Sequence, residues 1–363
     1  MKAFAAGLLL MAVASFAQTK SGASSQQAEA AATPKISAVQ TVIPLTSSST
    51  INVPSEMGGA FMVPAKCGED GNLYIRKYAT DRPLLGPVVK IDQDGKRTAL
   101  FDPVAFSKLD LDRADAFSPA SDGGLYQIAQ QGILNPRIYV LHFSSDGSPS
   151  SPVLLEADLE VYTFAAFPGG NFLVSGVQRD ARTSKDRGRN FTAVFSADGR
   201  ELAQLSFEEA QVAGKAGAKE GASKLETKSL AEKPAPTLDL SDAEVGADGN
   251  LYVMRGSSPA LVYVIAPSGE IVRTLKVVSP APGLTPSAFH VSGNQVAVSF
   301  WNDEKQTHIL VVTDAQTGRR ISTFSGATGA GASFACYSAN DGVFTFLRLG
   351  EGNALEVIRA EAR

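Results

Sequence analysis

The chain has 363 residues, of which 44% are hydrophobic and 19% are charged, with 33 glycines, 19 prolines and a formal net charge of −4. This composition predicts a folded chain with a large core and many turns, and it excludes a fully disordered protein. A negative net charge does not indicate the basic surface with which nucleic-acid-binding proteins neutralise phosphates, so no nucleic-acid partner is expected.

The first residues, "MKAFAAGLLLMAVASFAQTK", are typical of a secretory signal peptide. Lys2 precedes a short apolar run, and Ser15 and Ala17 supply small residues three positions and one position before the expected cut. Residues 1–17 are therefore predicted to be removed, which places the protein in the periplasm or outside the cell; a retained anchor is the alternative. No later segment is long and apolar enough to span a bilayer, so no membrane span is expected after removal of the signal.

Two further segments carry few large apolar side chains. Residues 18–35 ("QTKSGASSQQAEAAATPK") are predicted to be a disordered leader. Residues 208–237 ("EEAQVAGKAGAKEGASKLETKSLAEKPAPT") are rich in Ala, Lys, Glu and Gly and are predicted to be a flexible insertion. The remainder of residues 36–363 is expected to form one domain.

A turn followed by an apolar strand recurs along this domain. Each copy has a glycine that can supply the positive φ of a tight hairpin turn, usually after an Asp or Ser that bonds its own backbone. The copies are "DGNLYI" at Asp70, "DGGLYQ" at Asp122, "GGNFLV" at Gly169, "DGNLYV" at Asp248, "SGNQVA" at Ser292 and "DGVFTF" at Asp341.

The spacing of the copies predicts the fold. Successive turns are about 44 to 52 residues apart, apart from the one interval that contains the insertion, and this is the period of a propeller blade. One short strand precedes each turn and two or three follow it, so the sequence predicts an all-β, six-bladed propeller of four-stranded blades. The last copy is one strand short, and residues 36–45 ("ISAVQTVIPL") are predicted to complete that blade and close the ring.

The turn-plus-strand pattern of residues 36–363 resembles six-bladed β-propellers of the NHL-repeat and TolB-like kind, which are common among exported bacterial proteins. In such a closed ring, the first and last blades are neighbours. Cys67 lies four residues before Gly71 and Cys336 lies six residues before Gly342, so both fall on the first strand of a blade and on the same strand face. A Cys67–Cys336 disulfide across the closure is therefore predicted, with two buried free thiols as the alternative.

No catalytic or metal-binding motif is present. The chain has no HExxH pair, no Cys/His cluster with zinc spacing, no nucleophile elbow, no phosphate loop and no haem motif. No cofactor is expected, and a non-enzymatic role is favoured. In six-bladed lactonases of the gluconolactonase type, acidic and amide side chains hold calcium at the channel mouth. Glu69, Glu244, Asn302 and Asp303 are residues of that kind, so the alternative is a calcium-assisted, lactonase-like hydrolase.

The favoured function is an exported binding module that acts as a monomer. In propellers resembling this one, the loops that join second to third strands gather around the channel mouth. Converging guanidinium groups there would suit carboxylates or phosphates, and a tryptophan beside amide and carboxylate groups would suit a sugar or a peptide. A solvated rim is the alternative. The expected partner is an envelope protein, a peptide or a glycan. The candidate ligand-binding residues are Lys77, Tyr78, Arg179, Arg182, Arg255, Trp301, Asn302, Asp303 and Arg348.

Overall fold

The computed structural model describes residues 41–55, 60–133, 136–179, 188, 190–207, 240–326 and 332–362. The predicted signal peptide, leader and insertion, and the candidate Arg182, lie outside these residues. Among the described residues, no helix has both the length and the apolar character needed to cross a membrane.

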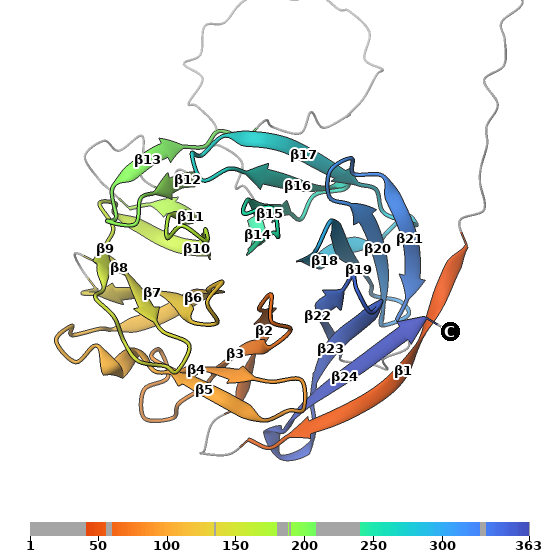
Figure 1. The fold of residues 1–363 in the computed structure, drawn as a ribbon, viewed down its shortest axis with the longest axis horizontal. Coiled ribbons are helices and arrows are strands. Elements are labelled where there is room, and N and C mark those ends of the chain that lie inside the picture. The colour runs from red at the N-terminus through yellow and green to blue at the C-terminus, as the bar shows by residue number, and fades with distance from the viewer. Residues whose placement is uncertain are drawn as a thin grey trace, which may run out of the picture. The chain divides into compact units, whose positions relative to one another are not determined.

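Four sheets of four antiparallel strands surround a central channel, and Figure 1 looks along this channel. Each sheet follows chain order from its innermost strand outward, which is the arrangement of a β-propeller. The four sheets are β2 (Phe61–Cys67), β3 (Leu73–Lys77), β4 (Val88–Ile91) and β5 (Arg97–Phe101); β6 (Arg113–Pro119), β7 (Leu125–Gln131), β8 (Arg137–Phe143) and β9 (Val153–Leu154); β10 (Leu159–Ala166), β11 (Phe172–Gln178), β12 (Asn190–Phe195) and β13 (Glu201–Gln204); and β14 (Leu240–Val245), β15 (Leu251–Arg255), β16 (Ala260–Ile265) and β17 (Ile271–Val277).

A fifth sheet of eight strands completes the ring. Its order is β18-β19-β20-β21-β1-β24-β23-β22. The strands are β18 (Thr285–Ser292), β19 (Gln295–Asn302), β20 (Thr307–Asp314), β21 (Arg320–Ser325), β1 (Val42–Val53), β24 (Leu355–Ala362), β23 (Val343–Leu349) and β22 (Ser333–Ser338). Two 3₁₀ helices, η1 (Pro103–Ala105) and η2 (Glu351–Asn353), lie in connections.

The prediction of six separate four-stranded blades is wrong, and β1 is the reason. The prediction that residues 36–45 complete the last blade is not confirmed, because residues 36–40 lie outside the described part of the chain and, of the others, only Leu45 pairs with β24. Instead, β1 runs antiparallel to β24 from Leu45 to Val53. Its first residues, however, also pair in parallel with β21, where Val42 lies opposite Thr323. Because one twelve-residue strand hydrogen-bonds to both neighbours, the last seven strands and β1 form a single sheet.

The repeated turns have the predicted conformation. All six turn glycines have a positive φ; for example, φ is 73° at Gly71 and 75° at Gly249. In these two turns an aspartate accepts a hydrogen bond from the backbone N–H two residues later. The pairing of each innermost strand with the next strand also contains a register shift, so the innermost strands are kinked beside the channel.

The core lies in the layers between neighbouring sheets. One layer packs Phe101 edge-to-face against Phe143 between the first two sheets, and another holds Phe334 and Phe346 between the two halves of the eight-stranded sheet. The predicted disulfide is confirmed, because Cys67 on β2 is bonded to Cys336 on β22 with 6.0 Å between their Cα atoms. The seam where the ring closes is therefore fastened by a covalent bond as well as by β1.

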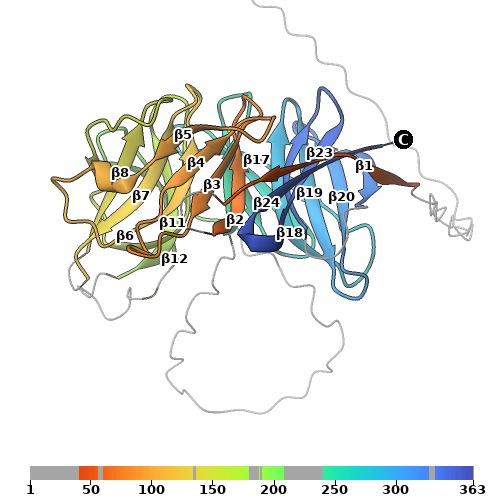
Figure 2. The same cartoon turned by 90° about the horizontal axis from the view of Figure 1, so that it is seen from below.

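The ring has two distinct faces, seen edge-on in Figure 2. The turn face carries the repeated turns that join first to second strands, and the chain ends on this side at the end of β24. The loop face carries the connections from second to third strands, including η2 between β23 and β24. These two names are used below.

Candidate functional site

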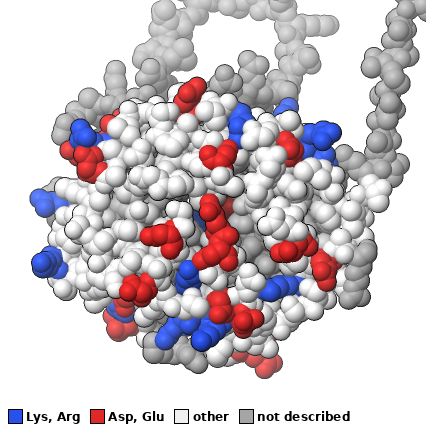
Figure 3. All heavy atoms as spheres, in the orientation of Figure 1, with Lys and Arg blue, Asp and Glu red and all other residues white. Residues whose placement is uncertain are grey.

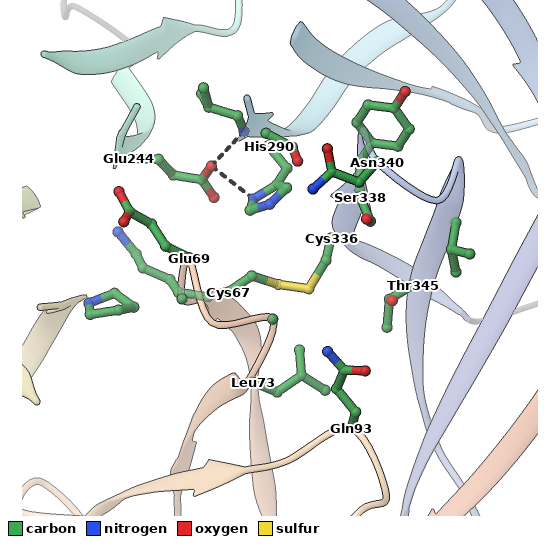
Figure 4. Close-up of a pocket in the computed structure, with 18 of the residues that line it drawn as sticks. Cys67, Glu69, Leu73, Gln93, Glu244, His290, Cys336, Ser338, Asn340 and Thr345 are labelled. Atoms are coloured by element: carbon green, nitrogen blue, oxygen red, sulfur yellow. Dashed lines mark hydrogen bonds and ion pairs between the residues drawn. A yellow bond between two sulfur atoms is a disulfide. The ribbon is translucent and has the colours of Figure 1, made fainter. Parts of the chain in front are cut away.

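A cavity of about 490 Å³ opens at the centre of the turn face. Its walls are the inner strands β2, β14, β18 and β22 and the turns that follow them, and it extends outward between the first sheet and β1. The volume is within the range of about 300 to 1,000 Å³ that is usual for small-molecule sites. Figure 4 shows the cavity in close-up, with the closing disulfide as part of its wall.

Lys66 crosses the channel below this cavity. Its Nζ lies 2.9 Å from Asp242 Oδ1 and donates to the carbonyl oxygen of Ala243 at 2.9 Å, both on β14. A longer contact of 3.5 Å reaches the carbonyl oxygen of Phe164 on β10. Lys66 is only 9% exposed, so the first sheet is tied to the third and fourth across the channel, and the charge of the ammonium group is matched by Asp242.

Glu244 and His290 form the next layer of the cavity wall. The Oε2 atom of Glu244 accepts from the backbone N–H of Val291 at 3.0 Å and lies 3.0 Å from Nδ1 of His290. The latter contact lacks the alignment of a hydrogen bond, and it is an ion pair only when the imidazole is protonated. Both side chains are about 10% exposed. Glu244 therefore joins the fourth sheet to β18 through one of its two carboxylate oxygens.

Glu69 faces the same part of the cavity from the turn after β2, as Figure 4 shows. It is exposed, and within the described part of the chain it has no hydrogen bond or ion pair. Figure 3 looks onto this face and shows acidic side chains gathered around its centre. The mouth of the cavity is therefore negatively charged.

The residues proposed for calcium binding do not come together. Glu69 and Glu244 line the cavity, whereas Asn302 ends β19 and Asp303 follows it on the loop face. In the described residues, no group of three or more His, Cys, Asp or Glu side chains is arranged to hold a metal ion.

The sequence-predicted binding residues other than Arg182, which lies outside the described residues, are on the loop face, where several of them contact neighbouring side chains. Arg348 pairs with Glu356, directly opposite it on β24, with 2.6 Å between Nε and Oε2. Nη2 of Arg179 lies 3.6 Å from Oε2 of Glu160. Lys77 lies over the ring of Phe61, with 5.3 Å between Nζ and the ring centroid.

The remaining candidates follow the same face. Trp301 donates its indole N–H to Asp303 at 2.6 Å, and the side chain of Asn302 accepts from the backbone N–H of Lys305. Tyr78 is exposed, whereas Arg255, at the end of β15, has a buried Nη1 atom without a hydrogen bond among the described residues. Trp301, Asn302 and Asp303 are thus brought together by one loop. Their role in ligand binding stays a prediction.

Sequence reasoning missed Lys66 and His290. A signal for the first was present, because Lys66 precedes Gly71 by the same five positions by which Glu244 precedes Gly249. A charged residue at a fixed place before a repeated turn indicates a channel-facing position. His290 had no such signal, since its place in the wall depends on the kink in β18.

Comparisons with known proteins assign no family. No protein-family model and no curated protein matches the chain. Solved structures with a similar course include the Dos1 propeller (12% identity, 80% of this chain and 75% of that chain, TM-score 0.39). Another is the Neurospora crassa Pan2 WD40 domain (12% identity, 89% of this chain and 98% of that chain, TM-score 0.44). A third is a putative oxidoreductase (glucose dehydrogenase) from Thermus thermophilus (13% identity, 86% of this chain and 99% of that chain, TM-score 0.43).

Proposed function

We propose that this β-propeller is a binding module that holds a small polar ligand, or the end of a larger partner, in the turn-face cavity. The observation that carries the proposal is the cavity itself, because it joins a suitable volume to buried polar side chains at the channel mouth. Small-molecule sites combine a concave shape with a few polar groups that fix the orientation of the ligand.

The proposal includes export from the cytoplasm. The Cys67–Cys336 disulfide supports it, because disulfides persist mainly in oxidising compartments such as the periplasm and the extracellular space. The signal-peptide-like residues 1–17 and the resemblance to NHL-repeat and TolB-like propellers support the same placement. Partners would then be components of the envelope or of the extracellular medium.

The loop face is a second candidate surface. It is favoured by the placement of Trp301 beside Asp303, which presents an aromatic ring next to a carboxylate, as sugar- and peptide-binding sites do. Of the four residues proposed for the lactonase-like hydrolase, only Glu69 and Glu244 line the cavity. Measurable turnover of a lactone would support that alternative.

Two tryptophan substitutions distinguish the faces. Ala247→Trp would fill the mouth of the cavity from an exposed turn position, and Thr80→Trp is the matched change at an exposed position on the loop face. Thermal unfolding is measured with a panel of amines, sugars, lactones and short peptides, because a ligand at about a hundred times its Kd stabilises the fold by roughly 2.7 kcal/mol. We expect Ala247→Trp to abolish the shift and Thr80→Trp to retain it.

If the shift in melting temperature is retained in Ala247→Trp and lost in Thr80→Trp, the site lies on the loop face instead. If no compound shifts the melting temperature of the unsubstituted protein, small-molecule binding in the cavity is refuted.

A further inference from the structure

We infer that the ligand of the turn-face cavity carries an organic cation, an ammonium or guanidinium group, which is held by Glu69, Glu244 and His290. The inference rests on the proposed function and names the class of ligand. It is argued from the unused acceptors in the cavity wall and from the absence of an internal cation to meet them.

Glu244 is the first of these acceptors. The side chain is about 10% exposed, and only Oε2 contacts protein groups, namely Val291 and His290. Within the described residues, Oε1 has no partner. A carboxylate has about four lone-pair sites, and a largely buried one is costly unless charged or hydrogen-bonding groups meet it. The free oxygen is therefore suited to a donor that comes from the ligand.

His290 is an independent second observation. The residue is 8% exposed, its Nδ1 makes no aligned hydrogen bond, and its Nε2 has no partner in the described part of the chain. In the neutral imidazole, the carboxylate beside Nδ1 favours the tautomer that carries the proton there, which leaves Nε2 as an acceptor. A buried imidazole with a free acceptor, lining the cavity next to Glu244, points to a donor in the cavity (Figure 4).

Glu69 supplies a third acceptor at the mouth. Its carboxylate points toward the side of the cavity that holds Glu244 and His290 (Figure 4). An ammonium group has three donors and no acceptor, and a guanidinium group has five donors in a planar fork. Three acceptor groups around one part of a cavity match either cation, whereas a carboxylate or phosphate ligand would be repelled.

Among the described residues, the lysine and the arginine that line the cavity already have partners. The ammonium group of Lys66 is matched by Asp242. Arg359 also lines the cavity, but its guanidinium group donates to the backbone carbonyl oxygen of Gln93. A metal ion is not favoured, because in the described residues no group of three His, Cys, Asp or Glu side chains is arranged to hold one. An organic cation is what the remaining acceptors fit.

The walls beside these acceptors suit the carbon stem of such a cation. The Cys67–Cys336 disulfide and the buried side chain of Leu73 line the cavity next to the polar groups. Lysine- and arginine-like groups place their methylene stems on apolar surface while the charged end is solvated or paired. The cavity can therefore hold both ends of a group of this type.

The test uses three blocked tripeptides that differ in one side chain: acetyl-Gly-Lys-Gly-amide and its Gln and Glu counterparts. Binding to the full chain, with its disulfide intact, is measured by isothermal titration calorimetry. We expect the Lys peptide to bind at least tenfold more tightly than the Gln peptide, and the Glu peptide to give no measurable binding. Glu244→Gln should weaken binding of the Lys peptide at least tenfold, and Glu69→Gln should weaken it less.

Glu304→Gln is the matched control, because Glu304 is an exposed glutamate beyond β19 on the loop face. It should leave binding unchanged. Should Glu244→Gln fail to fold, the exposed Glu69→Gln still decides the question, and unchanged binding in that variant would overturn the inference.

The outcomes separate the two proposals. Equal binding of the Lys and Gln peptides, or preference for the Glu peptide, together with loss in Ala247→Trp, overturns the cation inference and leaves the binding cavity standing. Lys-peptide binding that survives Ala247→Trp overturns both for this cavity. If neither these peptides nor the compound panel binds, the proposed function fails, and the inference fails with it.

Discussion

Polar side chains beside the turn-face cavity are used differently from those of the loop face. On the loop face, charged residues meet each other, as Arg348 meets Glu356 and Arg179 approaches Glu160. On the turn face, Asp70 and Asp248 of the repeated turns are also paired, with Lys90 and Arg273. Beside the cavity, however, Glu69 has no such partner among the described residues, and Glu244 uses only one of its oxygens. Because paired charges already satisfy each other, unused acceptors beside a cavity indicate a site better than residue type does.

The faces also differ in how they are fastened, and the largest predicted effect tests this. The disulfide lies on the turn side of the seam and closes a loop with a sequence separation of 269 residues. Replacing both cysteines, as Cys67→Ala/Cys336→Ala, should lower the free energy of unfolding by up to about 4 to 5 kcal/mol, because the unfolded chain regains loop entropy. Urea unfolding without reductant measures the loss.

Reduction of the unsubstituted protein is the control, and it should give a similar loss. If the double variant unfolds at the same urea concentration as the parent, then the pairing of β1 and the packed core hold the seam without help from the covalent bond.

The second prediction concerns the link across the channel. Lys66→Met would leave Asp242 without its cation, with its side chain 25% exposed. Breaking a fully buried pair costs about 3 to 5 kcal/mol, and partial exposure of Asp242 reduces this, so we expect a loss of about 2 to 3 kcal/mol in urea unfolding.

A double-mutant cycle with Asp242→Asn gives the coupling between the two side chains. Lys66→Met/Asp242→Asn should recover part of the stability lost by Lys66→Met alone. Strict additivity of the two single changes would show that the ion pair does not stabilise the channel.

A pH-dependent effect comes from His308, near the loop face. Burial lowers the pKa of His308 below its ordinary 6.5, while its Nε2–H donates to the carbonyl oxygen of Ala332 at 2.8 Å and its Nδ1 bonds Ser299. Above pH 6.5 the ring is neutral in both states and changes nothing. As the pH falls below 6.5 the unfolded chain takes up the proton first, so stability is lost until the folded pKa is reached.

Urea unfolding between pH 7.5 and pH 5 measures this slope, and His308→Asn should flatten it. Burial raises the pKa of Asp70 and Asp248, but their hydrogen bonds together outweigh it and leave the pKa lowered; these groups act at lower pH, because their ordinary pKa is 3.8. An unchanged slope in the variant would assign the pH dependence to other groups.

The accuracy of the sequence predictions follows the range of the interactions involved. The turns were predictable because Gly71 and its equivalents act through local backbone conformation. The disulfide followed from the repeat, since both cysteines precede a turn on an innermost strand. The parallel pairing of β1 with β21 was not predictable, because it joins residues about 280 positions apart and has no local signal.

The site was predicted less well than the fold for a related reason. Residue type alone made Arg348 a candidate binding residue. The structure instead places Glu356 directly opposite it on β24, so the two side chains pair with each other. The cavity wall instead depends on kinks in the inner strands, which decide whether His290 or a neighbouring residue faces the channel. A sequence repeat locates such strands but does not give the direction of each side chain.

The smallest predicted effect returns to the loop face. Arg348→Gln would remove a pair in which the arginine side chain is 39% exposed, and exposed ion pairs contribute about 0 to 1 kcal/mol, so unfolding should change by less than about 1 kcal/mol. Binding of the Lys peptide should not change, because Arg348 already donates to Glu356 and lies on the face opposite the cavity. A tenfold loss of binding would instead show that the two faces act as one site, since a charge paired within its own hairpin would then influence a ligand at the other end of the channel.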